Sequence, residues 1–405
     1  MKSNIVVVLD VGSTKVTCLA ADLDDRGSVR VLSAHSVESG GLKGGVPVDL
    51  PETSRAIAVA IDGVSNDLEE SVETVIVSVG GAHVEGLNAQ GLKPIVPRDR
   101  PITYQDVLEV INHSRSVILP PDREQFQALP KEFRVDGQRD VHKPIGMRGG
   151  KLEVVTYIAT ASVGHLQSLD KAVTNAGVKV DQMVLAPLAA GIGVLTPDEM
   201  ELGAVAVDIG AGTTDVAVFS NGSLAHAATL PVGSMHVTSD LVKLLKTSQE
   251  HAEALKVDSG CALGRLVRDD ESVEVIQLGQ FQARPLQRKV LAEIIEARMR
   301  EIAVMVRQQI EKSGLYAMLP GGVILTGGGA HLAGVDKLFE EVLSHLRVRV
   351  AEPWLPESVG VRAGMAVPVG LAYFALQCYD ELGPATGTQD WRDRVKSLFS
   401  IISGR

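Results

Sequence analysis

One local pattern occurs twice in this chain and constrains its fold more than any other feature. A run of four apolar residues leads into Asp-x-Gly at residues 10–12, and the same order returns at residues 208–210. In both copies a second strand, a turn and a third strand follow. Such apolar runs are typical of strands buried on both faces, which requires helices to cover the sheet. The repetition therefore predicts a duplicated α/β fold with two related lobes.

Between the two copies, residues 83–163 depart from the module and hold an unusual share of proline and arginine. A helix is expected to open at Thr103, because Asp106 three residues later gives a capping-box-like arrangement. A strand over residues 152–159 is expected after a Gly-Gly turn. This segment is therefore predicted to be a subdomain inserted into the first lobe.

The charge balance limits the classes of partner. Lysine and arginine number 39 and aspartate and glutamate 50, which gives a net charge of −11. A surface of this sign repels a phosphate backbone, and aromatic residues at 3% leave few rings for base stacking. Nucleic acid is therefore not expected as the main partner.

The cysteines and the hydropathy pattern indicate the compartment. Three cysteines, spread along the chain, suit neither a zinc site nor a disulfide framework, which favours a reducing cytoplasm. No uncharged apolar run reaches the ~18 residues of a membrane span, and the N-terminal apolar run is too short for a signal-peptide core. The body of the protein is predicted to be soluble.

Both Asp-x-Gly loops hold the groups that grip a phosphate. Glycine lets backbone N–H groups approach an anion closely, and a tight turn points several of them the same way. Asp10 and Asp208 would face bound phosphates, which these carboxylates tolerate only with a hydrated Mg²⁺ between them. The predicted phosphate-contacting residues are Gly12, Ser13, Thr14, Lys15, Gly210, Ala211, Gly212, Thr213 and Thr214.

These two loops and a third glycine turn resemble the phosphate-1, phosphate-2 and adenosine motifs of the actin, DnaK and hexokinase superfamily. The third turn comprises Gly327, Gly328 and Gly329. The resemblance implies an actin-like fold in which two lobes close over ATP and Mg²⁺. It also implies that the third turn approaches the adenosine end of the nucleotide.

Further segments resemble the FtsA family of bacterial division proteins. They are residues 232–241, 252–256, 260–264, 269–275, 286–288, 291–298 and, within the insert, 144–153. By position in the family, Glu253 and Lys256 would hold the ribose and adenine, and Gly233 would line the cleft. The alternative for Glu253 and Lys256 is a solvated helical pair three residues apart.

The resemblance implies a role in assembly. Such a protein polymerises on the cytoplasmic face of the cell membrane at the division site, tethers filaments of the tubulin-like protein FtsZ there, and recruits later division proteins through its insert. One rival is a sugar or carboxylate kinase of the same superfamily, which would need a substrate-facing base near the cleft. Another is a pilus-assembly actin homologue.

One departure from the superfamily concerns hydrolysis. Many of these proteins carry glutamate where this chain has Ala186, and that carboxylate would orient the attacking water. Alanine can neither accept nor donate a proton. The sequence therefore predicts ATP binding with at most slow hydrolysis.

The C-terminal residues 391–405 follow a polar linker at 380–390 and form a distinct tail. At ~100° per residue its large apolar side chains share a ~120° arc, with basic residues opposite. This pattern is typical of a helix lying in the interface of an anionic bilayer, whereas the alternative is a terminal helix docked on its own core. The predicted membrane-contacting residues are Trp391, Arg392, Arg394, Val395, Lys396, Leu398, Phe399 and Ile402.

A long helix over residues 286–313 shows Arg298 and Glu301 on one face. Such a pair is usually a solvated surface. In FtsA the matching helix belongs to the subdomain that receives the C-terminal peptide of FtsZ, which makes both residues candidate peptide contacts.

The resemblance divides the chain into nine segments. The first lobe takes 1–82, 164–191 and 359–379, with the insert at 83–163; the second takes 192–240 and 316–358, with a smaller subdomain at 241–315; the linker and tail are 380–390 and 391–405.

Overall fold

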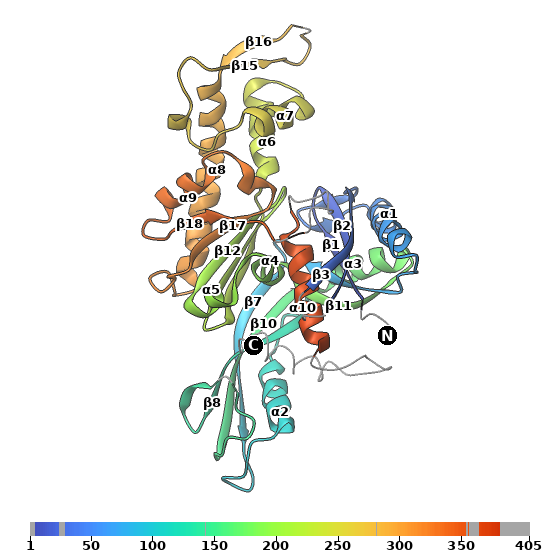
Figure 1. Cartoon of the computed structure of the whole chain (residues 1–405), viewed down its shortest axis with the longest axis vertical. Helices are drawn as coiled ribbons and strands as arrows, with labels where there is room; N and C mark the ends of the chain where they lie inside the picture. Colours follow the sequence, from blue (N-terminus) through green and yellow to red (C-terminus); the bar gives the residue numbers. More distant parts are fainter. Residues whose placement is uncertain are drawn as a thin grey trace.

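The computed structural model describes residues 5–23, 29–141, 143–280, 282–353, 355 and 364–380. It contains two five-stranded sheets, a four-stranded sheet and two short hairpins within these residues. Figure 1 shows the four-stranded sheet projecting from one end of the molecule and one hairpin, β15–β16, at the opposite end. The two five-stranded sheets lie between these ends, as the repeated sequence module predicts.

The first lobe contains a sheet of strand order β11-β6-β1-β2-β3. Its strands and covering helices are β1 (Val6–Val11), β2 (Lys15–Leu23), β3 (Val29–Glu38), β6 (Thr74–Val79), β11 (Lys179–Leu185), α1 (Leu50–Leu68) and α3 (Val163–Asn175), with a short hairpin β4 (Leu42–Lys43) and β5 (Val46–Pro47) beside them. Strands β1, β2 and β3 form the expected meander of antiparallel neighbours. Helix α1 packs Ile57, Ile61 and Val64, spaced three and four residues apart, onto the sheet.

The second lobe repeats this arrangement with the order β14-β13-β12-β17-β18. Its elements are α5 (Pro197–Leu202), β12 (Ala204–Ile209), β13 (Thr214–Ser220), β14 (Ser223–Leu230), β17 (Gly322–Thr326), the 3₁₀ turn η2 (Gly328–His331), α9 (Val335–Val342) and β18 (Val348–Val350). In each lobe the strand that precedes Asp-x-Gly pairs antiparallel with its successor and parallel with a later strand. The duplication predicted from sequence is therefore present in the topology.

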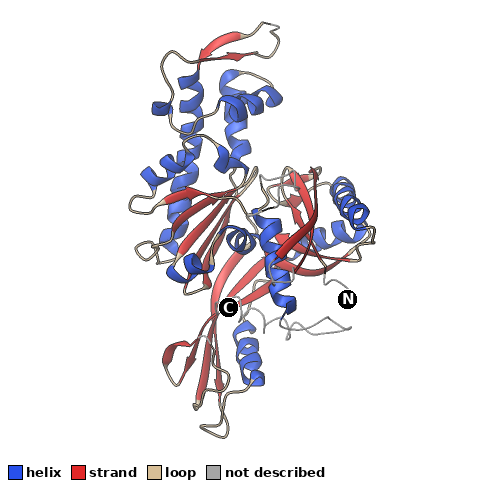
Figure 2. Ribbon diagram, in the orientation of Figure 1, coloured by secondary structure: helices blue, strands red, loops and turns tan. Residues whose placement is uncertain are grey.

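Helices α4 (Ala186–Val194) and α10 (Ala366–Asp380) join the two lobes through one shared core (Figure 2). They approach at backbone contact, because a Cβ on Gly370 would lie 1.7 Å from the Ala189 carbonyl oxygen. A Cβ on Gly193 would similarly lie 2.2 Å from the Ala366 carbonyl oxygen. Only glycine permits such a crossing, so these two positions fix how closely the helices pack.

A smaller unit extends the second lobe. It contains α6 (Ser234–Leu245), α7 (Gln249–Ser259), the 3₁₀ turn η1 (Gly264–Leu266), β15 (Ser272–Val275), β16 (Arg284–Gln287) and α8 (Arg288–Lys312). Helix α8 begins two residues later than the sequence pattern suggests, because Leu286 and Gln287 pair with β15. None of the helices in the described ranges is both long and apolar enough to cross a membrane.

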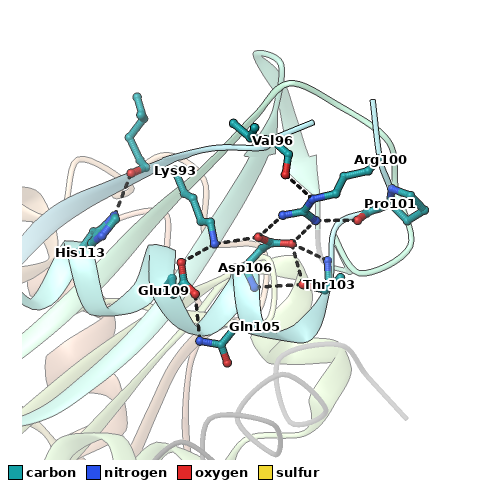
Figure 3. Close-up of polar contacts among 10 residues, drawn as sticks. Lys93, Val96, Arg100, Pro101, Thr103, Gln105, Asp106, Glu109 and His113 are labelled. Atoms are coloured by element: carbon teal, nitrogen blue, oxygen red, sulfur yellow. Dashed lines mark hydrogen bonds and ion pairs between the residues drawn. The ribbon is translucent and has the colours of Figure 1, made fainter. Parts of the chain in front are cut away.

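The insert is a sheet of order β7-β10-β8-β9 with one helix against it. Its elements are β7 (Glu85–Pro94), α2 (Tyr104–Arg115), β8 (Arg123–Val135), β9 (Gln138–Val141) and β10 (Lys151–Ser162). Thr103 and Asp106 form the predicted capping box at the start of α2. Figure 3 shows that Arg100 and Lys93 also hold the Asp106 carboxylate, with N–O distances from 2.6 to 2.8 Å. These bonds, with Arg100 contributing most, keep the pKa of Asp106 far below its usual range.

The insert also contacts the edge strand of the second lobe. Lys131 Nζ on β8 donates to the Ala225 carbonyl oxygen at 3.0 Å, and Ser223 Oγ donates to the Lys131 carbonyl oxygen at 3.1 Å. Tyr157 on β10 donates through its hydroxyl to the Ala227 carbonyl oxygen at 3.2 Å. We call these three hydrogen bonds the insert seam. It joins a segment that is continuous with the first lobe to strand β14 of the second.

Candidate functional site

The two Asp-x-Gly loops adopt the same turn. In the first, the Gly12 N–H donates to the Lys15 carbonyl oxygen, and in the second the Gly210 N–H donates to the Thr213 carbonyl oxygen, both at 2.9 Å. Each loop joins two antiparallel strands whose register places Asp10 opposite Thr17 and Asp208 opposite Asp215. Similar local sequence has therefore produced the same turn in both lobes.

The loops also approach each other across the space between the lobes. A Cβ placed on Gly212 would lie 2.5 Å from Ser13 Oγ and 3.0 Å from Ser13 Cβ. A larger residue at 212 would push the two loops apart. The absence of a side chain there brings loops 198 positions apart in sequence into direct apposition.

The third glycine turn closes against the second loop. Gly327 has φ of 82° and ψ of 172°, a conformation open almost only to glycine, and a Cβ there would lie 2.0 Å from Asp208 Oδ1. Gly329 packs against Ile209, with Cγ2 2.4 Å from where its Cβ would be. Gly328 meets no atom within 4 Å of an added Cβ and faces open space.

Three carboxylates gather at the base of the loops, where Asp215 is buried and Asp10 and Asp208 are partly buried. Burial raises the pKa of Asp10 to about 6, although a 2.6 Å hydrogen bond from Ser78 Oγ opposes the shift. Burial, with the nearby Asp215 and Asp10, raises the pKa of Asp208 to about 8. Burial likewise raises the pKa of Asp215 to about 7, against a hydrogen bond from Thr229. Each carboxylate therefore has its pKa raised, first by burial, so that proton loss requires a higher pH than usual.

Asp215 was not among the residues selected from the sequence. The signal was present, because residues directly opposite in an antiparallel pair lie side by side, and Asp215 is opposite Asp208. The first lobe has Thr17 at the equivalent place, so a comparison of the two loop sequences alone did not reveal an acidic pair.

These carboxylates fit a hydrated magnesium ion better than a directly ligated metal. Within the described ranges, no group of three or more His, Cys, Asp or Glu side chains is placed to hold a metal ion. Mg²⁺ keeps several waters and needs only one or two carboxylates when phosphates supply other oxygens. Asp10 and Asp208, with the unpredicted Asp215, provide that donor set.

Glu253 and Lys256 line the same cleft from helix α7. Lys256 is buried, and its Nζ donates to Glu253 at 2.7 Å and to Thr238 Oγ1 at 3.0 Å. The alternative of a fully solvated helical pair is wrong for Lys256, because helix α6 covers it. Glu253 remains about half exposed at the cleft wall, with its side chain 47% accessible.

Two residues assigned to the cleft do not line it. Thr214 is fully buried and donates its hydroxyl to the Val232 carbonyl oxygen at 2.8 Å, so it holds β13 to the following segment. Gly233 lies behind the second loop, where a Cβ would be 2.5 Å from the carbonyl oxygens of Gly210 and Ala211. Both residues support the loop rather than face the cavity.

The remaining residues enclose a cleft of about 1110 Å³. Its wall includes Ala186 at the start of α4, close to Gly80, whose added Cβ would lie 3.2 Å from Ala186 Cβ and 3.8 Å from Asp215 Oδ2. The predicted residues that line it are Asp10, Gly12, Ser13, Thr14, Lys15, Asp208, Gly210, Ala211, Gly212, Thr213, Glu253, Lys256, Gly327, Gly328 and Gly329. Most of the sites selected from sequence thus converge on one cavity.

The candidate peptide contacts lie elsewhere, on α8. Arg298 Nε and Nη2 donate to the two oxygens of Asp240 on α6, at 2.7 and 3.1 Å, and Nη1 donates to Glu301. Arg298 is therefore already held by two acidic side chains, and the pKa of its guanidinium is raised, first by the Asp240 hydrogen bond. The predicted membrane-contacting residues from Trp391 onward lie outside the described residues.

Comparison with known proteins supplies a family. The family description "Cell division protein FtsA" matches residues 205–368, and "SHS2 domain inserted in FTSA" matches residues 81–160. Cell division protein FtsA of Pseudomonas aeruginosa is 34% identical over 349 residues, covering 86% of this chain and 83% of that protein. FtsA of Escherichia coli K12 is 35% identical over 357 residues, with coverage of 86% and 84%. FtsA of Bacillus subtilis is 34% identical over 374 residues, with coverage of 92% and 84%.

Solved structures share the fold at lower identity. The PilM-PilN type IV pilus biogenesis complex contains a chain with a TM-score of 0.63 and 16% identity, covering 92% of this chain and 98% of that one. MreB5 of Spiroplasma citri bound to ADP gives a TM-score of 0.56 at 14% identity, with coverage of 91% and 95%. These matches confirm the predicted actin-like architecture.

Proposed function

The chain belongs to the FtsA family of cell-division proteins, and on this premise we propose that it binds Mg²⁺ and ATP between its lobes. The observation that carries the proposal is the apposition of the two mirrored turns, with Ser13 Oγ 2.5 Å from the Cβ position of Gly212. Their backbone N–H groups and the Lys15 charge offer donors to phosphate oxygens.

The acidic groups explain why a divalent cation accompanies the nucleotide. Phosphate oxygens beside Asp10, Asp208 and Asp215 would add negative charge to groups whose pKa is already raised. Asp10, Asp208 and Asp215 are the residues that would hold Mg²⁺, and the ion would supply positive charge that offsets the carboxylates and the phosphates. Lys256 and Glu253 line the same cleft from α7, where they would hydrogen-bond a ribose and base.

Binding is tested by titrating the protein with a fluorescent ATP analogue, with Mg²⁺ and with excess EDTA. Saturable binding that weakens at least about tenfold in EDTA supports the proposal. Lys15 is exposed in the first loop, and the variant Lys15→Met removes its positive charge. This change is expected to weaken ATP binding more than ADP binding, because ATP carries one more phosphate for that charge to contact. Equal affinity with and without Mg²⁺ would contradict the site.

Hydrolysis is proposed to be slow. Ala186 occupies the cleft wall beside Gly80, and its methyl group cannot orient a water molecule. Phosphate release measured under saturating ATP should therefore be slow in the natural chain. The variant Ala186→Glu is expected to accelerate it, and rapid turnover by the natural chain would refute this part of the proposal.

The output of the bound state is proposed to be assembly on a membrane. Ligand between two lobes stabilises the closed arrangement it binds best, which favours subunit contacts made by that arrangement. Actin-like filaments would align many copies of the basic tail on the cytoplasmic face of the division-site membrane, so that moderate individual affinities add up. We propose that these filaments tether FtsZ there and recruit later division proteins through the insert.

Co-sedimentation with anionic vesicles tests the tail and the polymer together. The full chain with ATP should sediment with vesicles, and a chain ending at residue 390 should not. The double variant Trp391→Glu, Phe399→Glu should also fail to bind, whereas retained vesicle binding would contradict the membrane proposal.

The FtsZ-peptide surface is tested with a matched pair of variants. Arg298→Glu removes the positive charge, whereas Asp240→Asn frees Arg298 from its internal partner. If an acidic peptide binds here, the first variant should weaken binding and the second should maintain or strengthen it. Equal loss in both variants would show that only the α6–α8 packing matters.

A further inference from the structure

Two histidines in the cleft wall are not used by the nucleotide site as derived above. His83 lies just before β7, and His165 lies in the first turn of α3. Their rings contact edge to face with centroids 4.4 Å apart and an interplanar angle of 61°. Both residues line the same cavity as Asp10, Lys15 and Ala186.

The hydrogen-bonding state of the two rings is unusual. The Nδ1 atoms of His83 and His165 are enclosed and have no hydrogen-bond partner among the described residues. The edge of the His83 ring that carries Nδ1 lies against Gly81, where an added Cβ would be 2.9 Å from Nδ1 and 3.0 Å from Cε1. Because both residues line the cavity and neither Nδ1 is accessible, Nε2 is the ring nitrogen left to face it.

This asymmetry selects the tautomer. A buried N–H without an acceptor is rarer and costlier than a bare acceptor, so the proton belongs on Nε2, where the cavity can solvate it. Burial, with the charges of His165 and Arg123, lowers the pKa of His83 to about 4, which keeps that ring neutral. The enclosed Nδ1 atoms thus leave two Nε2–H donors, on rings whose centroids lie 4.4 Å apart.

The surroundings of these donors favour a negative ligand. His165 lies in the first turn of α3, a helix of 13 residues whose N-cap, Ser162, makes no side-chain capping hydrogen bond. The Val163 N–H donates to the Asp122 carbonyl oxygen at 2.9 Å, and the positive end of the helix dipole lies in the same turn. The Arg123 guanidinium also adjoins His83, since Nη2 donates to the His83 carbonyl oxygen at 3.1 Å.

We propose that His83 and His165 form an oxyanion position in the first-lobe wall of the cleft, beside the phosphate loops. Its ligand is a phosphate group held by two imidazole N–H donors. Two sources supply that chemistry: the terminal phosphate of a bound nucleotide, and free inorganic phosphate after hydrolysis. The identity of the anion rests on the proposed nucleotide site, but the tautomer and the paired donors do not.

Histidine nitrogen NMR on the full chain tests the position. Both rings should show the Nε2–H tautomer in the free protein. Addition of inorganic phosphate, with and without ADP, and of a non-hydrolysable ATP analogue should shift the Nε2 signals saturably in at least one arm, while potassium chloride should not. The phosphate arms report free phosphate, and the analogue arm reports the nucleotide's own terminal group.

Variants separate this role from packing. His165→Leu should weaken phosphate binding about tenfold, whereas His165→Gln, which keeps a donor near the Nε2 position, should weaken it only about threefold. ADP affinity measured in the same variants should stay near that of the natural chain. Failure of the proposed nucleotide site would appear as a loss of ADP binding and is thereby distinguished from failure of the phosphate position. His113→Leu, in the insert away from the cleft, serves as the control.

Three results would overturn the proposal. One is an Nδ1–H tautomer in both rings, and another is the absence of a saturable shift in every arm. The third is equal phosphate affinity in His165→Leu and the natural chain, provided that the variant shows the natural chain's unfolding midpoint.

Discussion

The loops of the two lobes have the same backbone turn but opposite chemistry. The first offers Ser13, Thr14 and Lys15, so it brings hydroxyl groups and a cation. The second offers Ala211 and Gly212 in a nearly bare backbone, with the acidic pair Asp208 and Asp215 at its base. The two loops thus share their geometry, whereas the cation Lys15 is in the first and the acidic pair is in the second.

The pKa values of the acidic groups also differ between the two loops. Ser78 hydrogen-bonds Asp10, whose pKa is about 6, whereas Asp208 faces Asp215 and has a pKa of about 8. The first lobe therefore lowers the pKa of its carboxylate through Ser78, whereas the second lobe holds two carboxylates opposite each other. If Mg²⁺ binds as proposed, its charge would offset the greater repulsion in the second lobe.

The largest expected effect comes from the turn that supports only the second loop. Gly327→Ala forces a side chain into a glycine-only conformation and against Asp208 Oδ1, 2.0 Å away. It should lower the free energy of unfolding by more than about 3 kcal/mol and abolish nucleotide binding. Gly328→Ala is the matched control, since its Cβ meets nothing within 4 Å. Similar denaturation midpoints for the two variants would contradict the comparison.

The next effect concerns the contact between the loops. Gly212→Ala places a methyl group 2.5 Å from Ser13 Oγ and should weaken ATP binding about tenfold or more by separating the loops. Adding Ser13→Gly removes the clash, so the double variant should bind nearly as well as Ser13→Gly alone. A double-mutant cycle measures this, and additive losses would show that the loops do not meet.

A smaller effect appears in the pH dependence of stability without Mg²⁺. The pKa of Asp208 rises from 3.8 to about 8 on folding, so between these values the folded chain holds a proton that the unfolded chain has lost. Protonation of Asp208 therefore stabilises the folded chain at low pH. The free energy of unfolding falls by up to about 1.4 kcal/mol per pH unit as the pH rises towards 8. Urea denaturation from pH 5 to 8 in EDTA should show this slope. Asp208→Asn should flatten it, and an unchanged slope would contradict the assignment.

The smallest effect is expected in the first loop. Ser78→Ala removes the hydrogen bond that lowers the pKa of Asp10, so Asp10 should titrate nearer to Asp208. The variant should lower the free energy of unfolding by about 1 kcal/mol, measured by denaturation above pH 7. Its ATP binding should also depend modestly more on Mg²⁺. The internal control is the same comparison below pH 5, where folded Asp10 is protonated in both the natural chain and the variant.

The sequence contained most of the fold because its signals were local. Runs of apolar residues before Asp-x-Gly specified β1 and β12, and the Thr103–Asp106 box specified the start of α2. The phosphate loops could also be located, because glycine and hydroxyl residues at fixed spacing report the turn itself.

The remaining features depended on contacts between distant segments. Burial of Lys256 requires α6 to cover α7, and the His83–His165 pair requires the start of β7 to meet α3. Asp215 became part of the acidic group only through strand register. Thr214 and Gly233 followed the loop motif in sequence, but the fold directs them behind the loop, where hydrogen bonding and close packing use them.

The insert seam gives the architecture a mechanical property. The insert is covalently part of the first lobe, yet Lys131 and Tyr157 bind the backbone of β14 in the second. Any hinge rotation between the lobes must therefore either break these hydrogen bonds or move the whole insert as one rigid unit. If the bonds hold, a small rotation at the cleft produces a larger displacement at the far end of the insert.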